Sequence, residues 1–118
     1  IDVLNQFDFT GNAIALNLRN GDLYDPQGGI RDLSIRVMRM VRFDYPDDPI
    51  RPGHPLNRTS VLWFRVLHYA ALLNLNIEPV TLRWLSDRIE YRHDVEIFTQ
   101  YFFKPDDSYL KPLMKMEA

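Results

Sequence analysis

Cysteine is absent from this 118-residue chain. The absence excludes disulfide bonds, zinc held by thiolates and a cysteine nucleophile, so packing alone has to stabilise the fold. Long apolar runs are also missing. The most apolar stretch, residues 61–73, is interrupted by Arg65 and His68 and falls short of the ~20 apolar residues that a membrane-spanning helix needs.

A signal peptide is not recognisable at the start of the chain. We therefore expect an intracellular protein with no membrane partner. Because the chain begins at Ile1 rather than methionine, removal of a targeting segment and excision from a larger protein both stay open.

Lysine is scarce, whereas arginine is abundant and clustered. The three lysines all follow residue 103, and seven of the eleven arginines lie in residues 31–65. With four aspartates, that segment has a net charge of +3, although the whole chain has a net charge of −2. The overall balance argues against a general polyanion-binding domain, which is usually basic. A guanidinium group pairs bidentately with carboxylate or phosphate and stacks on aromatic rings, so the cluster indicates a binding surface.

Length and composition predict one domain with a sizeable core, because 46% of the residues are hydrophobic. We expect an α+β fold: a mainly helical single domain with a small N-terminal β-hairpin and a buried central helix. The globular domain is predicted to span residues 1–103. Residues 104–118 are predicted to be an irregular C-terminal tail, because they contain Pro105, Asp106-Asp107-Ser108 and Pro112.

Turn and capping signals place the individual elements. Asn20-Gly21-Asp22 is a tight-turn signal that predicts the hairpin. Residues 44–56 contain four prolines and are predicted to be a long loop. The central helix is expected to begin at a cap on Asn57 or Thr59 and to end near Asn74, and two more helices are expected after Pro79 and Asp94.

Residues 30–43 fit two patterns. On a helix, Ile30, Leu33 and Val37 share one face while the arginines of Arg36-x-x-Arg39-x-x-Arg42 share another. On a strand, Leu33, Ile35 and Val37 share one side. The length of the segment and the Gly29 boundary favour the helix.

Catalytic and metal-binding signatures are missing. The acidic loop residues near His54, and His93 beside Asp94, lack a known ligand spacing, and the serines lack a nucleophile elbow. Neither a P-loop nor a dinucleotide fingerprint is present. His68 is the one attractive acid–base candidate, but a lone histidine beside Arg65 is more often bonded to a neighbour. We therefore predict a protein that is not an enzyme, with no cofactor and no metal.

The arginine-rich segment supports two hypotheses. Arginine and aromatic residues are enriched in protein interfaces, so the first hypothesis is a non-catalytic interaction or assembly module that binds a protein partner. The expected partner is a second copy of the chain, in a homo-oligomer. The alternative is RNA or single-stranded nucleic acid, with arginines on phosphates and aromatic rings on bases. A third interpretation places the arginines in internal ion pairs with nearby carboxylates. The predicted binding residues are Arg36, Arg39, Arg42, Tyr45, Arg51, Arg58, Arg65 and His68.

Overall fold

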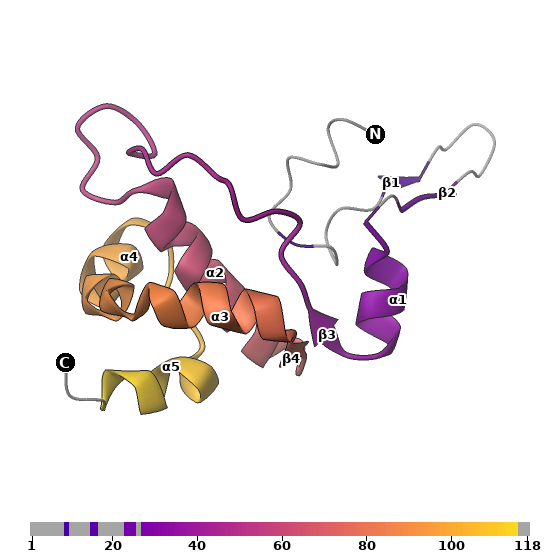
Figure 1. The fold of residues 1–118 in the computed structure, drawn as a ribbon. Coiled ribbons are helices and arrows are strands. Elements are labelled where there is room, and N and C mark those ends of the chain that lie inside the picture. Colours follow the sequence, from indigo (N-terminus) through magenta and orange to yellow (C-terminus); the bar gives the residue numbers. More distant parts are fainter. Residues whose placement is uncertain (1–8, 10–14, 17–22, 26, 116–118) are drawn as a thin grey trace.

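The computed structural model describes residues 9, 15–16, 23–25 and 27–115 (Figure 1). Its strands are β1 (Ala15–Leu16), β2 (Leu23–Tyr24), β3 (Val37–Met38) and β4 (Asn76–Ile77). Its helices are α1 (Gly29–Ser34), α2 (Arg58–Leu72), α3 (Pro79–Asp87), the 3-10 helix η3 (Ile89–Asp94), α4 (Val95–Tyr101) and α5 (Asp107–Met114). The predicted α+β, mainly helical fold is confirmed.

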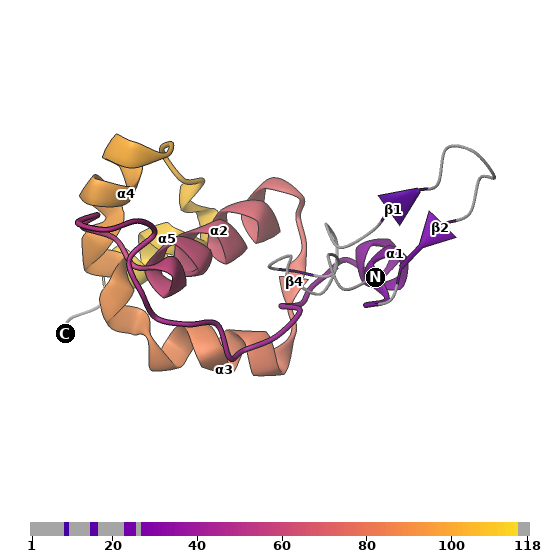
Figure 2. The ribbon, with the colours of Figure 1, turned by 90° about the horizontal axis from the view of Figure 1, so that it is seen from above.

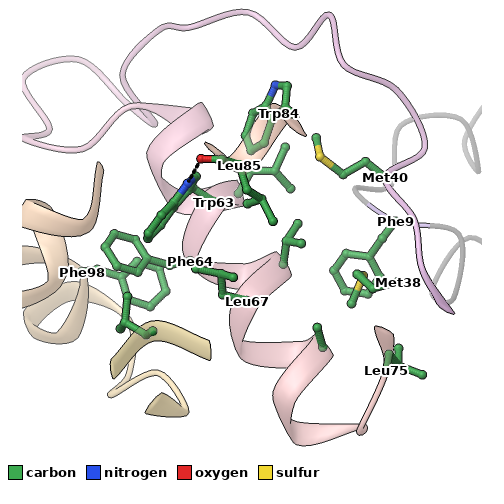
Figure 3. Close-up of a cluster of buried hydrophobic side chains, with 14 of the residues drawn as sticks. Phe9, Met38, Met40, Trp63, Phe64, Leu67, Leu75, Trp84, Leu85 and Phe98 are labelled. Carbon is green, nitrogen blue, oxygen red and sulfur yellow. Dashed lines mark hydrogen bonds between the residues drawn. The ribbon is translucent and has the colours of Figure 1, made fainter. Parts of the chain in front are cut away.

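The central helix α2 is buried on most of its circumference. Trp63, Phe64 and Val66 have no exposed surface, and α3, η3, α4 and α5 surround the helix (Figures 1 and 2). The Trp63 indole Nε1–H donates to the Leu85 carbonyl at 2.9 Å, and the Phe64 and Phe98 rings stack with centroids 4.7 Å apart (Figure 3). The predicted buried helix is therefore confirmed. Asn57 is the N-cap residue, as predicted, but its side chain makes no capping hydrogen bond.

The segment 30–43 is not one helix, which corrects the sequence-based preference. The carboxylate of Asp25 accepts the backbone N–H groups of Gly29 and Ile30 and so starts α1, but this helix ends at Ser34. Arg36 then adopts a left-handed backbone with φ of 59°. The chain continues into β3, which pairs in parallel with β4 through Val37↔Asn76 and Met38↔Ile77. Pairing with a distant segment outweighs the local helical pattern.

Residues 44–56 form the predicted loop, which contains no helix and only an isolated bridge between Pro49 and Asn57. The Arg58 N–H donates to the Asp48 carbonyl at 2.9 Å, and the Ile50 N–H donates to the Leu56 carbonyl at 3.2 Å. Leu56 is buried. The loop is therefore anchored to the start of α2 by its own backbone.

Both ends of the described chain bear on the sequence-based predictions. The antiparallel pairing Ala15↔Tyr24 and Leu16↔Leu23 agrees with the predicted hairpin, whose turn Asn20-Gly21-Asp22 lies outside the described residues.

Residues 107–114 are helical rather than irregular, because the Asp106 side chain caps α5 by accepting from the Ser108 N–H at 2.9 Å. The buried Leu110 and a hydrogen bond from the Tyr109 hydroxyl to the Leu75 carbonyl hold α5 in place.

Candidate functional site

Four of the predicted binding residues come together around two adjoining hollows. One hollow of about 240 Å³ is lined by Arg42, Tyr45, Pro46 and Arg58. The other, of about 180 Å³, is lined by Tyr45, Arg58 and Arg65 together with two apolar residues of α2. Because Tyr45 and Arg58 line both hollows, they form one surface feature. We call it the arginine–tyrosine cleft and define it by Arg42, Tyr45, Arg58 and Arg65.

A rigid element and a loop supply opposite walls of this cleft. Arg58 and Arg65 lie seven residues apart on α2, which brings two side chains to the same face of a helix. Arg42 comes from the segment between β3 and the loop and Tyr45 from the loop itself, and neither stretch contains a helix or an extended strand. The helical wall is fixed by the core beneath it, whereas the opposite wall depends on how the loop is anchored.

The guanidinium groups of Arg42 and Arg58 are held weakly. The Arg42 guanidinium carbon lies 4.7 Å from the Tyr45 ring centroid. Its Nε is 3.0 Å from Asp44 Oδ1, yet this buried nitrogen donates no hydrogen bond, so the contact is electrostatic. Arg58 Nε lies 3.2 Å from Asp48 Oδ1, and both side chains are more than half exposed. An exposed ion pair contributes only about 0–1 kcal/mol, so an incoming anion can compete for both arginines.

Arg65 occupies the far end of the cleft and is half-buried. Its guanidinium carbon lies 5.2 Å from the Tyr69 ring centroid and 5.9 Å from that of Phe9. A cation over aromatic faces keeps its charge while its stem packs against apolar surface. The cleft therefore ends in a positive charge bordered by aromatic rings.

Arg36, Arg39 and Arg51 are not among the residues that line the cleft. Arg39 donates through Nε to buried Asp32 at 3.1 Å and places a second nitrogen 3.5 Å from Glu78, so it joins α1 to the start of α3. Arg36 is exposed beside β3, and Arg51 is exposed in the loop. The expected common face of Arg36, Arg39 and Arg42 is absent because the helix ends before them. Three of the expected internal ion pairs are present: Arg39–Asp32, Arg42–Asp44 and Arg58–Asp48.

His68 packs inside the helical region, away from the two hollows. Its Nδ1 accepts the Asp106 backbone N–H at 2.8 Å, and its ring contacts Tyr69 and Phe103. Burial lowers the pKa of His68, a shift that the Asp106 carboxylate opposes and the positive charge of Arg65 reinforces. The neutral ring therefore anchors the segment before α5.

Sequence reasoning missed a hydroxyl network at the start of α2, next to Arg58. The Thr59 hydroxyl donates to the Asp47 carboxylate and lies 2.7 Å from the Tyr91 hydroxyl. This network joins the loop, the first turn of α2 and η3. Its signal in the sequence is Thr59 at the start of a strongly apolar helix, since a buried hydroxyl requires a partner.

Two further searches cover the described residues. Within residues 9, 15–16, 23–25 and 27–115, no three His, Asp or Glu side chains come together as possible metal ligands. In the same part of the chain, no helix has the length and apolar character to cross a bilayer.

The chain is similar to parts of much longer proteins, and no protein-family model matches it. It is 46% identical over 86 residues to the Multifunctional CCA protein of Xylella fastidiosa strain M12, a match that covers 73% of this chain and 19% of that protein. A solved structure described as a tRNA-processing enzyme with CTP matches 79% of this chain and 24% of its own, at 27% identity and a TM-score of 0.61. An apo form matches 75% and 22%, at 31% identity and a TM-score of 0.55.

These similarities correct the functional prediction. The sequence predicted a non-catalytic protein-interaction module that is not an enzyme. This prediction is wrong, because the solved structures that the chain resembles are of a tRNA-processing enzyme. The nucleic-acid alternative is closer to these relatives. The chain spans between 11% and 19% of the length of the Multifunctional CCA proteins that it matches. The roles of the individual arginines and the homo-oligomer stay predictions.

Proposed function

We propose that this chain is part of an enzyme that processes tRNA, and that the arginine–tyrosine cleft binds the RNA. The observation that carries the proposal is the 46% identity to a Multifunctional CCA protein over 86 residues, together with likeness to a tRNA-processing enzyme. The alignment covers 73% of the chain. We therefore expect α2 and the elements around it to have the same role in this protein as the matching segment has in its relative.

The chemistry of the cleft supports an RNA ligand. Guanidinium groups pair with phosphate oxygens, and a tyrosine ring stacks on an unpaired base. Arg42, Arg58 and Arg65 supply three such cations around Tyr45. The local charge of +3 over residues 31–65 attracts a polyanion even though the whole chain is slightly acidic.

The weak ion pairs of the cleft also favour an exchangeable ligand. Asp44 and Asp48 are exposed carboxylates that occupy the guanidinium groups without burying them. A backbone phosphate offers equivalent anionic oxygens that pair with guanidinium groups, so it can displace the carboxylates at small cost. Asp44 and Asp48 therefore pair with the two arginines when RNA is not bound.

The test is binding of a fluorescently labelled tRNA to the full protein, followed by anisotropy at about 50 mM and about 200 mM salt. The double variant Arg42→Ala/Arg58→Ala is expected to lose affinity and to reduce the slope of log affinity against log salt by about two, because two phosphate contacts are removed. Arg83→Ala, on exposed α3 surface, is the matched control. Equal affinity and slope for the double variant and the control would refute the proposal.

A further inference from the structure

An apolar groove lies beside the arginine–tyrosine cleft and shares only Arg65 with it. The groove has a volume of about 490 Å³ and lies between α1 and β3 on one side and the end of α2 on the other. Leu33, Leu72 and Leu73 form much of its rim, and Phe9 and Tyr69 add aromatic surface. We call it the apolar groove and define it by these five residues and Arg65.

Its rim leaves apolar side chains in solvent. Leu33, Leu72 and Leu73 are 37%, 58% and 51% exposed, and they come from two elements far apart in the sequence. Single exposed leucines are common, but three that converge on a hollow of this size mark a binding surface. The groove is therefore shaped to receive an apolar group.

Arg65 connects the groove to the cleft. It lines the apolar groove and also the smaller hollow of the cleft, so the two features meet at its side chain. Its guanidinium lies over the Tyr69 ring, which places one positive charge at the end of an otherwise apolar lining. A ligand that spans both features has to present an apolar part to the groove and an anionic part at Arg65.

We propose that the apolar groove receives an unpaired base of the RNA strand whose phosphates lie in the arginine–tyrosine cleft. Single-stranded RNA alternates flat bases with anionic phosphates, and this alternation matches an apolar groove that opens at Arg65 onto a cationic cleft. The face of Tyr69 and the leucines of the rim contact the base, and Arg65 binds the adjoining phosphate. An apolar protein segment fits the groove but offers no anion to the cationic cleft that the groove adjoins. This inference rests on the proposed function.

The test uses the full protein and a single-stranded RNA that carries 2-aminopurine at one position, with that position moved along the strand. At one position the fluorescence is expected to change on binding, because the base leaves water for the groove. An RNA that lacks the base at that position is expected to bind about tenfold more weakly, within the range that stacking of one base provides.

The variant Leu72→Ser/Leu73→Ser is expected to remove the fluorescence change and about tenfold of affinity, since it takes apolar surface from the rim. Leu33→Ser tests the opposite wall and keeps the test valid if the first variant unfolds. Leu82→Ser is the matched control, because Leu82 is a leucine of α3 that is 49% exposed and does not line the groove.

The outcomes separate the two proposals. If the protein fails to bind RNA at all, the proposed function is overturned and the groove inference falls with it. If RNA binds and Arg42→Ala/Arg58→Ala weakens it, while both groove variants and the abasic RNA match their controls, the groove inference alone is overturned. A groove variant that changes only the sedimentation of the protein also overturns it, because the occupant is then a protein segment.

Discussion

The two parts of this molecule are held together by different forces. The helical body, residues 58–114, packs α3, η3, α4 and α5 around the buried aromatic side chains of α2 (Figures 1 and 3). The N-terminal part, residues 29–57, consists of the six-residue α1, the two-residue β3 and the loop. In Figure 2, α1 lies to one side of the helical body. Ile30, Leu33 and Ile35 remain exposed there, so the region around α1 buries little apolar surface, and Met38, Met40 and Leu56 are the residues of this part that enter the core.

Polar contacts join the N-terminal part to the helical body. Arg39 bridges Asp32 and Glu78, and the Met40 N–H donates to the Thr81 hydroxyl at 3.1 Å. Met38 and Met40 add two buried side chains. The arginine–tyrosine cleft and the apolar groove both lie where the two parts meet, so each has one wall that belongs to α2 and one wall from the N-terminal part.

If apolar packing stabilises the helical body, removal of its largest buried side chain should lower the free energy of unfolding more than any other change. Trp63→Ala is expected to lower the free energy of unfolding by about 3–5 kcal/mol, since it leaves a cavity and removes the bond to Leu85. Urea denaturation measures the loss. Leu82→Ala, at an exposed position on α3, is the control. A Trp63 variant as stable as this control would show that the helical body does not depend on its core.

The N-terminal part is expected to respond to a change in charge. Arg39→Ala removes the charged bond to buried Asp32 and should cost about 1–3 kcal/mol, less than the Trp63 variant. The loss should be local, so hydrogen exchange of the Asn76 and Glu78 amides, which pair with β3, should accelerate more than that of α2.

Arg36→Ala is the control for this prediction, because Arg36 is an exposed arginine of the same segment. If hydrogen exchange accelerated equally in α2 and β4, the N-terminal part and the helical body would unfold as one unit. That result would contradict the proposed difference between the two parts.

The same contrast explains which features the sequence could predict. The helix at residues 58–72 follows from a nearly unbroken apolar run, and the loop follows from its prolines. Local signals decide both. The end of α1 at Ser34 instead reflects pairing of Val37 with Asn76, which no local pattern contains. Helix α5 begins at Asp106 as a cap, but Pro105 before it and Pro112 within it favoured an irregular tail in the sequence-based prediction.

The candidate site was foreseen in part. The spacing of Arg58 and Arg65 on α2 placed two of the four cleft residues on one face. Arg42 and Tyr45 join them through the path of the loop, which the sequence does not determine. The link to an enzyme has no signal in the residues taken singly, because guanidinium groups and aromatic rings suit protein and RNA partners alike.

The hydroxyl network offers a smaller test of the cleft. Tyr91→Phe removes one hydroxyl from the contact with Thr59 and should cost about 0.5–1.5 kcal/mol, as for a typical hydrogen bond. Because Thr59 also holds Asp47, the loop wall should loosen and RNA affinity should fall while the salt slope stays unchanged. Tyr109→Phe removes the hydrogen bond to the Leu75 carbonyl and serves as the control, because it should lower stability without altering affinity. A Tyr91 variant with unaltered RNA affinity would refute a role for the network in shaping the cleft.

The smallest expected effect is a pH dependence within the helical body. The folded pKa of His68 lies below its ordinary value of 6.5, mainly through burial, so the folded state favours the neutral ring. The unfolded chain then binds more protons, and the contribution of His68 is full above the unfolded pKa and is lost as the pH falls through about 6.5 toward the lower folded value. Protonation of Nδ1 also removes the acceptor for the Asp106 N–H.

Urea midpoints measured from about pH 8 to about pH 5 should therefore fall for the natural chain and fall less for His68→Gln, which retains an acceptor without titrating. Several groups around His68 affect its pKa or pack against its ring. The Asp106 carboxylate opposes the shift, Arg65 reinforces it, and Tyr69 and Phe103 present rings rather than charges. His54→Gln is the control, since it removes a histidine from the loop rather than from the core. Parallel midpoints for the His68 and His54 variants would assign the pH dependence to groups other than His68.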